Sequence, residues 1–166
     1  AQAEADIELA IQTGAQHISW YQLTIEPNTE FYSRPPLLPS DDHLADIQNI
    51  GSQKLQHACF SQYEVSAFAL DGQRSKHNMN YWQFGDYLGI GAGAHGKVTL
   101  PELNQVLRSS KTRQPDHYLA RTESAVAQQQ SIAHEQMALE FMMNGLRLRD
   151  GIPIMYFPHR TGLPTS

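Results

Sequence analysis

The residues best suited to chemistry in this chain lie in the run from position 76 to position 96. His77 and Asn78 offer an imidazole and an amide, and Tyr81 and Trp82 add flat aromatic surface with polar edges. Side chains of these types could hold a planar ligand or orient a metal-bound one. The plainer interpretation is a satisfied loop histidine with aromatic rings packed over the end of a sheet. Composition alone favours that interpretation, because ligand pockets are few in any protein.

A glycine-rich stretch at residues 91–96 follows this aromatic segment and has the spacing G-x-G-x-x-G. That spacing is typical of a dinucleotide-binding loop only where a helix follows and an acidic residue lies about 20 positions downstream. Here residues 97–101 look like a strand stopped by proline, so the dinucleotide interpretation is disfavoured. A turn whose Gly91 and Gly93 backbone approaches a ligand is one expectation, and a plain tight turn is the other. His95 has the same two interpretations.

A self-contained metal site is not expected. None of the eight histidines forms an H-x-x-H or H-x-x-x-H pair or a Cys/His set, and Cys59 is the single cysteine. Cys59 lies in a helical pattern, where we expect a buried small hydrophobic residue rather than a nucleophile.

Composition limits the classes of partner. The chain has 166 residues, 40% of them hydrophobic and 17% charged, with a formal net charge of -5. This balance predicts a globular protein and gives no electrostatic reason to expect nucleic acid. No apolar run approaches the roughly 20 residues of a membrane-spanning helix, and no signal peptide opens the chain. A cytoplasmic protein is therefore predicted, with peripheral membrane association left open.

The first seventy residues alternate between helical and strand patterns. Residues 3–13 and 40–58 predict helices, the second capped by Ser40, and residues 17–25 and 62–69 predict strands. The inward face of the second helix is predicted to hold Leu44, Ile47, Ile50 or Gly51, Leu55 and Ala58. This order predicts an α/β fold with a parallel sheet.

The rest of the chain reads as loops, a hairpin and a final helix. We expect a long loop at 71–85, a short strand at 87–90, a turn at 91–96, a hairpin around 101–104, a helical turn at 115–120, a polar linker at 121–132 and a helix at 133–146. A new module is predicted to begin at residue 133. The missing initiator methionine and the unfinished apolar pattern at the end suggest a piece of a longer protein.

Four stretches carry a resemblance to a known family. They are residues 21–29, 62–67, 77–82 and 85–97, in this order and spacing. Together they resemble the heme chaperone branch of the oxygen-independent coproporphyrinogen III oxidase family, in the radical S-adenosylmethionine superfamily. The H-N-x-x-Y-W element at 77–82 is what separates this branch from the oxidases, and the resemblance covers nearly the whole chain.

The resemblance implies an architecture for the full-length protein. It implies a partial (β/α)6 barrel that holds a [4Fe-4S] cluster and S-adenosylmethionine, followed by a helical, winged-helix-like C-terminal domain. In this chain, residues 1–120 would be the last barrel units, 121–132 a linker and 133–166 the start of the C-terminal domain. Members of the superfamily bind the cluster through C-x3-C-x2-C, which one cysteine cannot supply. No metal ligand and no catalytic residue are assigned within this chain.

The resemblance also implies roles for individual residues. Residues implied on the S-adenosylmethionine side are Thr24, Gly91, Gly93 and His95. Residues implied to be heme-associated are His77, Asn78, Tyr81 and Trp82.

Three functions are compared on this basis. The preferred expectation is a heme-binding chaperone that passes heme to acceptor proteins. The enzyme alternative is an oxygen-independent coproporphyrinogen III oxidase of porphyrin biosynthesis, which would convert two propionates to vinyl groups by radical decarboxylation. The third is a noncatalytic interaction domain, which binds neither heme nor cofactor.

Overall fold

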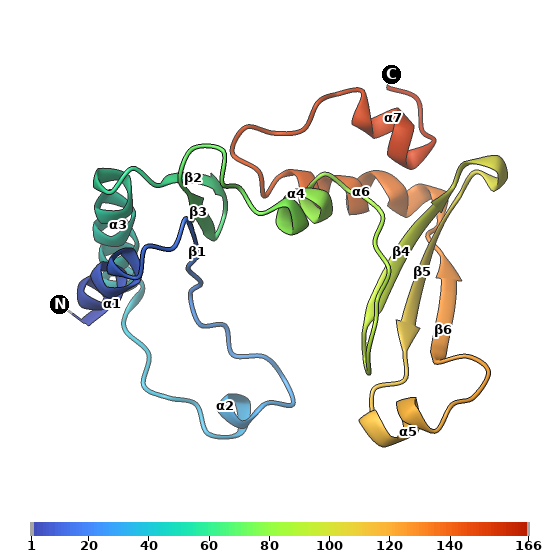
Figure 1. Ribbon diagram of the computed structural model, residues 1–166, viewed down its shortest axis with the longest axis horizontal. Coiled ribbons are helices and arrows are strands. Elements are labelled where there is room, and N and C mark those ends of the chain that lie inside the picture. Colours follow the sequence, from blue (N-terminus) through green and yellow to red (C-terminus); the bar gives the residue numbers. More distant parts are fainter. Residues whose placement is uncertain (1, 166) are drawn as a thin grey trace. The chain divides into compact units, whose positions relative to one another are not determined.

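The computed structural model describes residues 2–165 and divides them into two compact units (Figure 1). The first unit is Ala1–Ser75 and the second unit is Lys76–Ser166. Each unit has its own sheet and its own hydrophobic cluster. The mixed α/β class predicted from the sequence is confirmed. The boundaries at 120 and 133 stay predictions for the full-length protein.

The first unit packs two helices against a small sheet. Its elements are α1 (Gln2–Gln12), β1 (His17–Ser19), α2 (Glu30–Ser33), α3 (Asp41–His57), β2 (Ser61–Glu64) and β3 (Ala67–Ala69). The strands run in the order β1-β3-β2. Ile7 of α1 and Leu55 of α3 meet Phe60 and Phe68 in the core, with Trp20 at its edge.

The prediction of a parallel sheet is wrong, because both strand pairs in the first unit are antiparallel. The expected single strand at 62–69 is a hairpin that turns at Val65 and Ser66. The Glu64 carboxylate is buried and accepts a hydrogen bond of 3.0 Å from the Ser66 amide, which stabilises this turn. The strand expected at 17–25 ends at Ser19, and only the Trp20 amide continues the pairing by donating to the Ser66 carbonyl.

Helix α3 begins as predicted, and its inward face is settled by a glycine. The Ser40 hydroxyl accepts from the His43 amide at 3.4 Å and caps the helix. Gly51 is buried while Ile50 is exposed, and a Cβ at Gly51 would come within 2.1 Å of the Trp20 ring. Cys59 contradicts its expectation, because it is exposed and lies just after the helix with a φ of 66°.

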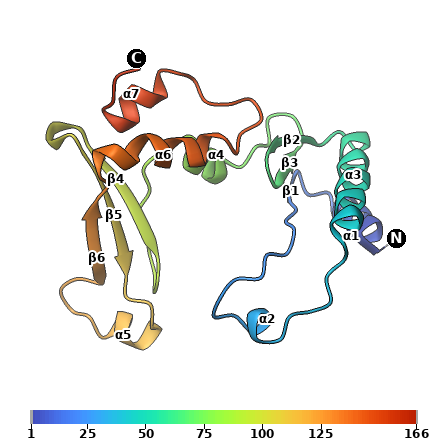
Figure 2. The same cartoon turned by 180° about the vertical axis from the view of Figure 1, so that it is seen from behind.

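The second unit is an antiparallel sheet with four α-helices among its described residues, of which the one between its last two strands lies at one end of the sheet (Figures 1 and 2). Its elements are α4 (Lys76–Trp82), β4 (His95–Leu100), a 3-10 turn (Pro101–Leu103), β5 (Gln105–Lys111), α5 (Pro115–Leu119), β6 (Val126–Ser131), α6 (His134–Gly145) and α7 (Tyr156–Thr161). Phe84 and Val106 form the core with Ile132, Met137 and Phe141.

The hairpin, the helical turn at 115–120 and the helix at 133–146 are confirmed in this unit. Three expectations change. The loop predicted at 71–85 contains α4, and the linker predicted at 121–132 contains β6, which pairs with β5. The strand predicted at 87–90 is reduced to one bridge between Tyr87 and Lys97. Within residues 2–165, no helix is both long and apolar enough to cross a bilayer.

Candidate functional site

Helix α4 sorts the four heme-associated candidates onto two faces. His77 and Tyr81 are four residues apart, so they share one face, and their rings meet edge to face at 4.7 Å between centroids. Tyr81 in turn lies 4.2 Å from the ring of Tyr87, in the segment that follows the helix. The imidazole of His77 is exposed at the end of this row. We call His77, Tyr81 and Tyr87 the aromatic row.

Asn78 and Trp82 lie on the other face of α4. The Trp82 ring lies beneath the Arg147 guanidinium, 4.3 Å from its carbon, and its Nε1 is buried without a hydrogen-bond partner in the described part of the chain. A cation over an indole stabilises the packing of the ring. Trp82 therefore anchors α4 to the chain after α6, while the aromatic row faces outward.

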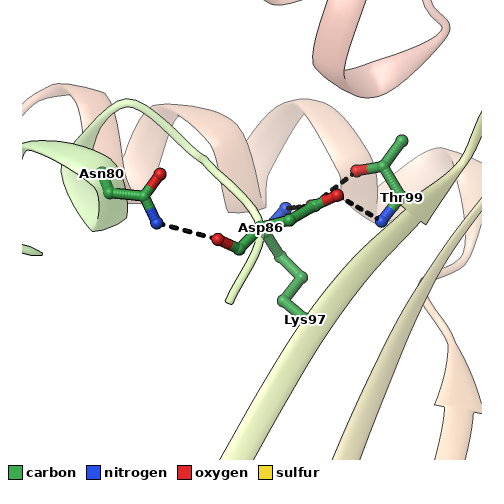
Figure 3. Close-up of polar contacts among 4 residues, drawn as sticks. All are labelled: Asn80, Asp86, Lys97 and Thr99. Carbon is green, nitrogen blue, oxygen red and sulfur yellow. Dashed lines mark hydrogen bonds and ion pairs between the residues drawn. The ribbon is translucent and has the colours of Figure 1, made fainter. Parts of the chain in front are cut away.

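A carboxylate beyond α4 fixes the segment that leads to the glycine turn (Figure 3). Asp86 accepts hydrogen bonds from the Thr99 amide and hydroxyl, both at 2.8 Å, and from Lys97 Nζ at 3.0 Å. The Asn80 side-chain amide donates to the Asp86 carbonyl at 2.9 Å. We call Asn80, Asp86, Lys97 and Thr99 the Asp86 cluster. It ties the end of α4 to β4.

The two charged groups of this cluster are partly shielded from water. The Lys97 side chain is only 3% exposed and lies 4.1 Å above the Phe84 ring. Burial lowers the pKa of Lys97, against the opposing effect of Asp86. Burial by itself would raise the pKa of Asp86, but the hydrogen bonds from Thr99 and Lys97 outweigh it, so that pKa lies below 3.8.

The glycine turn is built around positive backbone angles. Gly91 and Gly93 have φ of 102° and 71°, which favour glycine. The Gly93 amide donates to the Thr112 carbonyl at 2.8 Å, and the Gly91 amide donates to the Tyr118 hydroxyl at 3.3 Å. His95 then opens β4 with an exposed side chain. The turn is thus fixed to the ends of β5 and α5.

A cavity of about 480 Å³ lies beside this turn, in the second unit. Gly93 and His95 line it together with three cationic residues, Lys111, Arg113 and Arg121. Sequence reasoning singled out the first two and missed the three cations. They come from the end of β5 and from the approach to β6, and they stand apart from the quoted motifs.

Thr24, the remaining candidate, belongs to the first unit. It is exposed in the irregular segment after β1. The four residues implied on the S-adenosylmethionine side are therefore divided between the units, with Gly91, Gly93 and His95 in the second. Their assembly into one site stays a prediction.

Comparison with known proteins decides the family. A model of the HemN C-terminal domain matches residues 132–166. Over 98% of its length the chain is 48% identical to the heme chaperone HemW of Escherichia coli, and over 97% it is 48% identical to that of Haemophilus influenzae. The chain belongs to the HemW branch of the family. A mitochondrial radical S-adenosyl methionine domain-containing protein of Danio rerio is 33% identical over 82% of the chain.

The HemW relatives are longer than this chain, which spans 42% of the Escherichia coli protein and 41% of the Haemophilus influenzae protein. No solved structure matches the chain. Among residues 2–165, no group of three or more His, Cys, Asp or Glu side chains could hold a metal ion. The one cysteine does not fit an iron-sulfur cluster, so no chemistry at such a cluster is derived from these residues.

Proposed function

We propose that this chain is the heme-binding part of a HemW-type chaperone, which holds heme and passes it to acceptor proteins in the cytoplasm. The observation that carries the proposal is the aromatic row. An exposed imidazole stands at its end, with the Tyr81 and Tyr87 rings beside it. Neutral imidazole is a common ligand of heme iron, and aromatic rings pack well against a flat macrocycle.

The row is held in place by the surrounding structure rather than by the ligand. Trp82 packs under Arg147 on the far face of α4, and the Asp86 cluster fixes the chain just beyond the helix. A site formed before the ligand arrives loses less free energy in ordering its side chains. The fold therefore presents His77 and Tyr81 together on the outer face of one short helix.

The cofactors of the full-length protein are a further part of the proposal. We propose a [4Fe-4S] cluster and S-adenosylmethionine, with the cluster bound outside these residues. On the S-adenosylmethionine side, this chain would contribute Thr24 and the turn of Gly91, Gly93 and His95. The cofactor would supply radical chemistry when bound, whereas these residues would only contact and position it.

The first test is heme titration of the full-length protein, followed by the Soret band. We expect His77→Ala to weaken heme binding about tenfold or more and to shift the Soret maximum, because an axial ligand is lost. Protection from hydrogen exchange in α4 should stay unchanged, since the His77 side chain is exposed.

His43→Ala is the matched control, because it removes an exposed imidazole from the start of α3. It should leave both affinity and spectrum unchanged. Equal heme affinity in wild type and His77→Ala would refute the role of His77. A wild-type protein that binds no heme would refute the chaperone proposal itself.

Tyr81 gives a second prediction at the same row. Tyr81→Ala should weaken heme binding several-fold, because it removes the ring between His77 and Tyr87. Tyr81→Phe keeps that ring and should bind heme like the wild type. If both substitutions weaken binding equally, the hydroxyl rather than the ring surface makes the contact. Titration by Soret absorbance at fixed salt separates the two results.

A further inference from the structure

The cavity beside the glycine turn is strongly cationic. Lys111, Arg113 and Arg121 line it with His95, and no carboxylate is among the lining residues in the described part of the chain. Arginine and lysine gathered without acidic partners favour an anionic ligand, and arginine suits the two oxygens of a carboxylate. The chain as a whole is acidic, with a net charge of -5, so this cluster is a local exception.

Strand register places this cavity next to the aromatic row. His95, Ser110 and Gln128 line the cavity and are partners across β4, β5 and β6. The adjacent row on the same face is Lys97, Arg108 and Gln130, and Tyr87 pairs with Lys97. Residues two apart in a strand share a face and lie about 7 Å apart. One ligand the size of a porphyrin can therefore reach from Tyr87 to the cavity.

The helices leave this end of the sheet open. The Arg108 guanidinium is bound by the Glu140 carboxylate of α6, with contacts of 3.1 and 2.5 Å. Helices α6 and α7 lie near the hairpin end of the sheet, whereas β4 begins at the α5 end (Figure 2). His95 is the first residue of β4. The pair of His95 and Ser110 thus lies two residues along the strands from Arg108, the residue that Glu140 of α6 binds.

Hydrogen bonds hold the main chain of this cavity wall and orient one of its cations. The Lys111 amide donates to the Ala94 carbonyl at 2.8 Å, and the Gly93 amide donates to Thr112 next door. Arg121 Nη1 donates to the Val126 carbonyl at 3.1 Å, so its guanidinium is already oriented. The Thr112 hydroxyl, in the same wall, is buried with no partner in the described residues. The wall therefore holds charges ready for an anion and a hydroxyl donor still to be used.

We propose that this cavity binds the propionate carboxylates of heme, with Lys111, Arg113 and Arg121 as their partners. The inference rests on the proposed function. The apolar macrocycle would lie along Tyr81 and Tyr87, while its charged edge would reach the cations. Such a two-part site distinguishes heme from apolar ligands without carboxylates, because cations left unpaired beside a neutral ligand gain nothing from binding.

The test compares heme with its dimethyl ester, in which both propionates are neutral. The full-length protein and its Lys111→Gln/Arg113→Gln variant are titrated with each, followed by Soret absorbance. We expect the variant to bind heme about tenfold more weakly, with a reduced dependence on salt. The wild type should bind the ester more weakly than it binds heme, and the variant, which keeps only Arg121 of the three cations, should distinguish the two ligands much less than the wild type does.

The matched control is Arg160→Gln, which removes one positive charge from α7, where the guanidinium lies 4.5 Å from the Tyr156 ring. It should bind heme like the wild type. Equal heme affinity in the wild type and the double variant overturns the inference and leaves the chaperone proposal standing. If the variant loses S-adenosylmethionine in equilibrium dialysis but keeps heme, the propionate assignment is overturned. The cations would then bind the carboxylate of S-adenosylmethionine instead. Absence of heme binding in the wild type overturns both proposals.

Discussion

Replacing Phe141 by alanine is expected to lower the free energy of unfolding of the second unit by about 3–5 kcal/mol. Phe141 is 5% exposed, and its ring meets Phe84 at 5.7 Å and Phe157 at 5.2 Å between centroids. It therefore joins three segments: the chain just after α4, helix α6 and helix α7. Truncation leaves a cavity between these segments, and few neighbours are free to fill it.

Hydrogen exchange of the full-length protein, resolved by peptide, measures this effect within the unit. Peptides from α4, α6 and β5 should lose protection together, because Phe84, Phe141 and Val106 share one cluster. Leu139→Ala is the matched control, since Leu139 lies on the same helix but is 63% exposed. Loss of protection in α6 alone would contradict this prediction, because it would show that α4 and β5 do not depend on the Phe141 ring.

The same cluster shows how far the sequence predicts this fold. The sequence of 133–146 predicts one apolar helical stripe that holds Met137, Ala138, Phe141, Met142 and Leu146, because a long helix carries a clear period. In the structure Met137 and Phe141 are buried, whereas Met142 and Leu146 are exposed. An apolar stripe in the sequence shows which face of the helix turns inward. The elements that pack against the helix decide how much of that face is buried.

Two elements were missed because their residues are polar. The glutamine-rich β6 shows no alternation of apolar residues, since only Val126 is partly covered along it. It lies at the edge of the sheet, where main-chain pairing with β5 suffices. Helix α4 has seven residues, too few for an apolar period to be visible. Its four-residue spacings, His77 to Tyr81 and Asn78 to Trp82, are the signal that could have revealed it.

The candidate site was predicted in part. Residues 77–97 hold the aromatic row and the glycine turn, and their chemistry was visible in side-chain types alone. The role of the three cations could not be predicted. Lys111, Arg113 and Arg121 come close to His95 only through strand pairing, which the sequence pattern does not indicate. Asp86 lies inside a quoted motif, yet its link to Lys97 and Thr99 depends on the path of the chain after α4.

Asp86→Asn is expected to reduce the stability of the segment from α4 to β4 by about 2 kcal/mol. The substitution removes the anionic partner of a buried ammonium group, since Lys97 is 3% exposed. Breaking a fully buried pair costs about 3–5 kcal/mol, and the 44% exposure of Asp86 reduces that figure. Hydrogen exchange in peptides spanning 84–100 should report the loss. Glu102→Gln, an exposed carboxyl in the same hairpin, should report none.

The pH dependence has a definite sign. The pKa of Asp86 lies below 3.8 in the folded protein, so its contribution is complete above 3.8 and is lost as the pH falls through the folded value. The pKa of Lys97 is lowered by burial from 10.5, so the folded protein gives up this proton more readily than the unfolded chain does. As Lys97 loses its proton, the stability of the folded protein therefore rises with pH between the folded-state pKa of Lys97 and 10.5. Protection corrected for intrinsic exchange should fall in acid in the wild type, and Asp86→Asn should lose that acid step.

A double variant separates the cost of an unpaired charge from the value of the ion pair. Lys97→Met keeps apolar contact with the Phe84 ring, 4.1 Å from the ammonium in the wild type, and removes the buried charge. If the loss of stability in Asp86→Asn comes mainly from leaving the buried Lys97 charge without an anionic partner, adding Lys97→Met should restore much of the lost protection. Additive losses would instead assign the effect to the Thr99 hydrogen bonds. The comparison therefore shows whether the ion pair with Lys97 or the hydrogen bonds from Thr99 hold the segment between the aromatic row and the glycine turn in place.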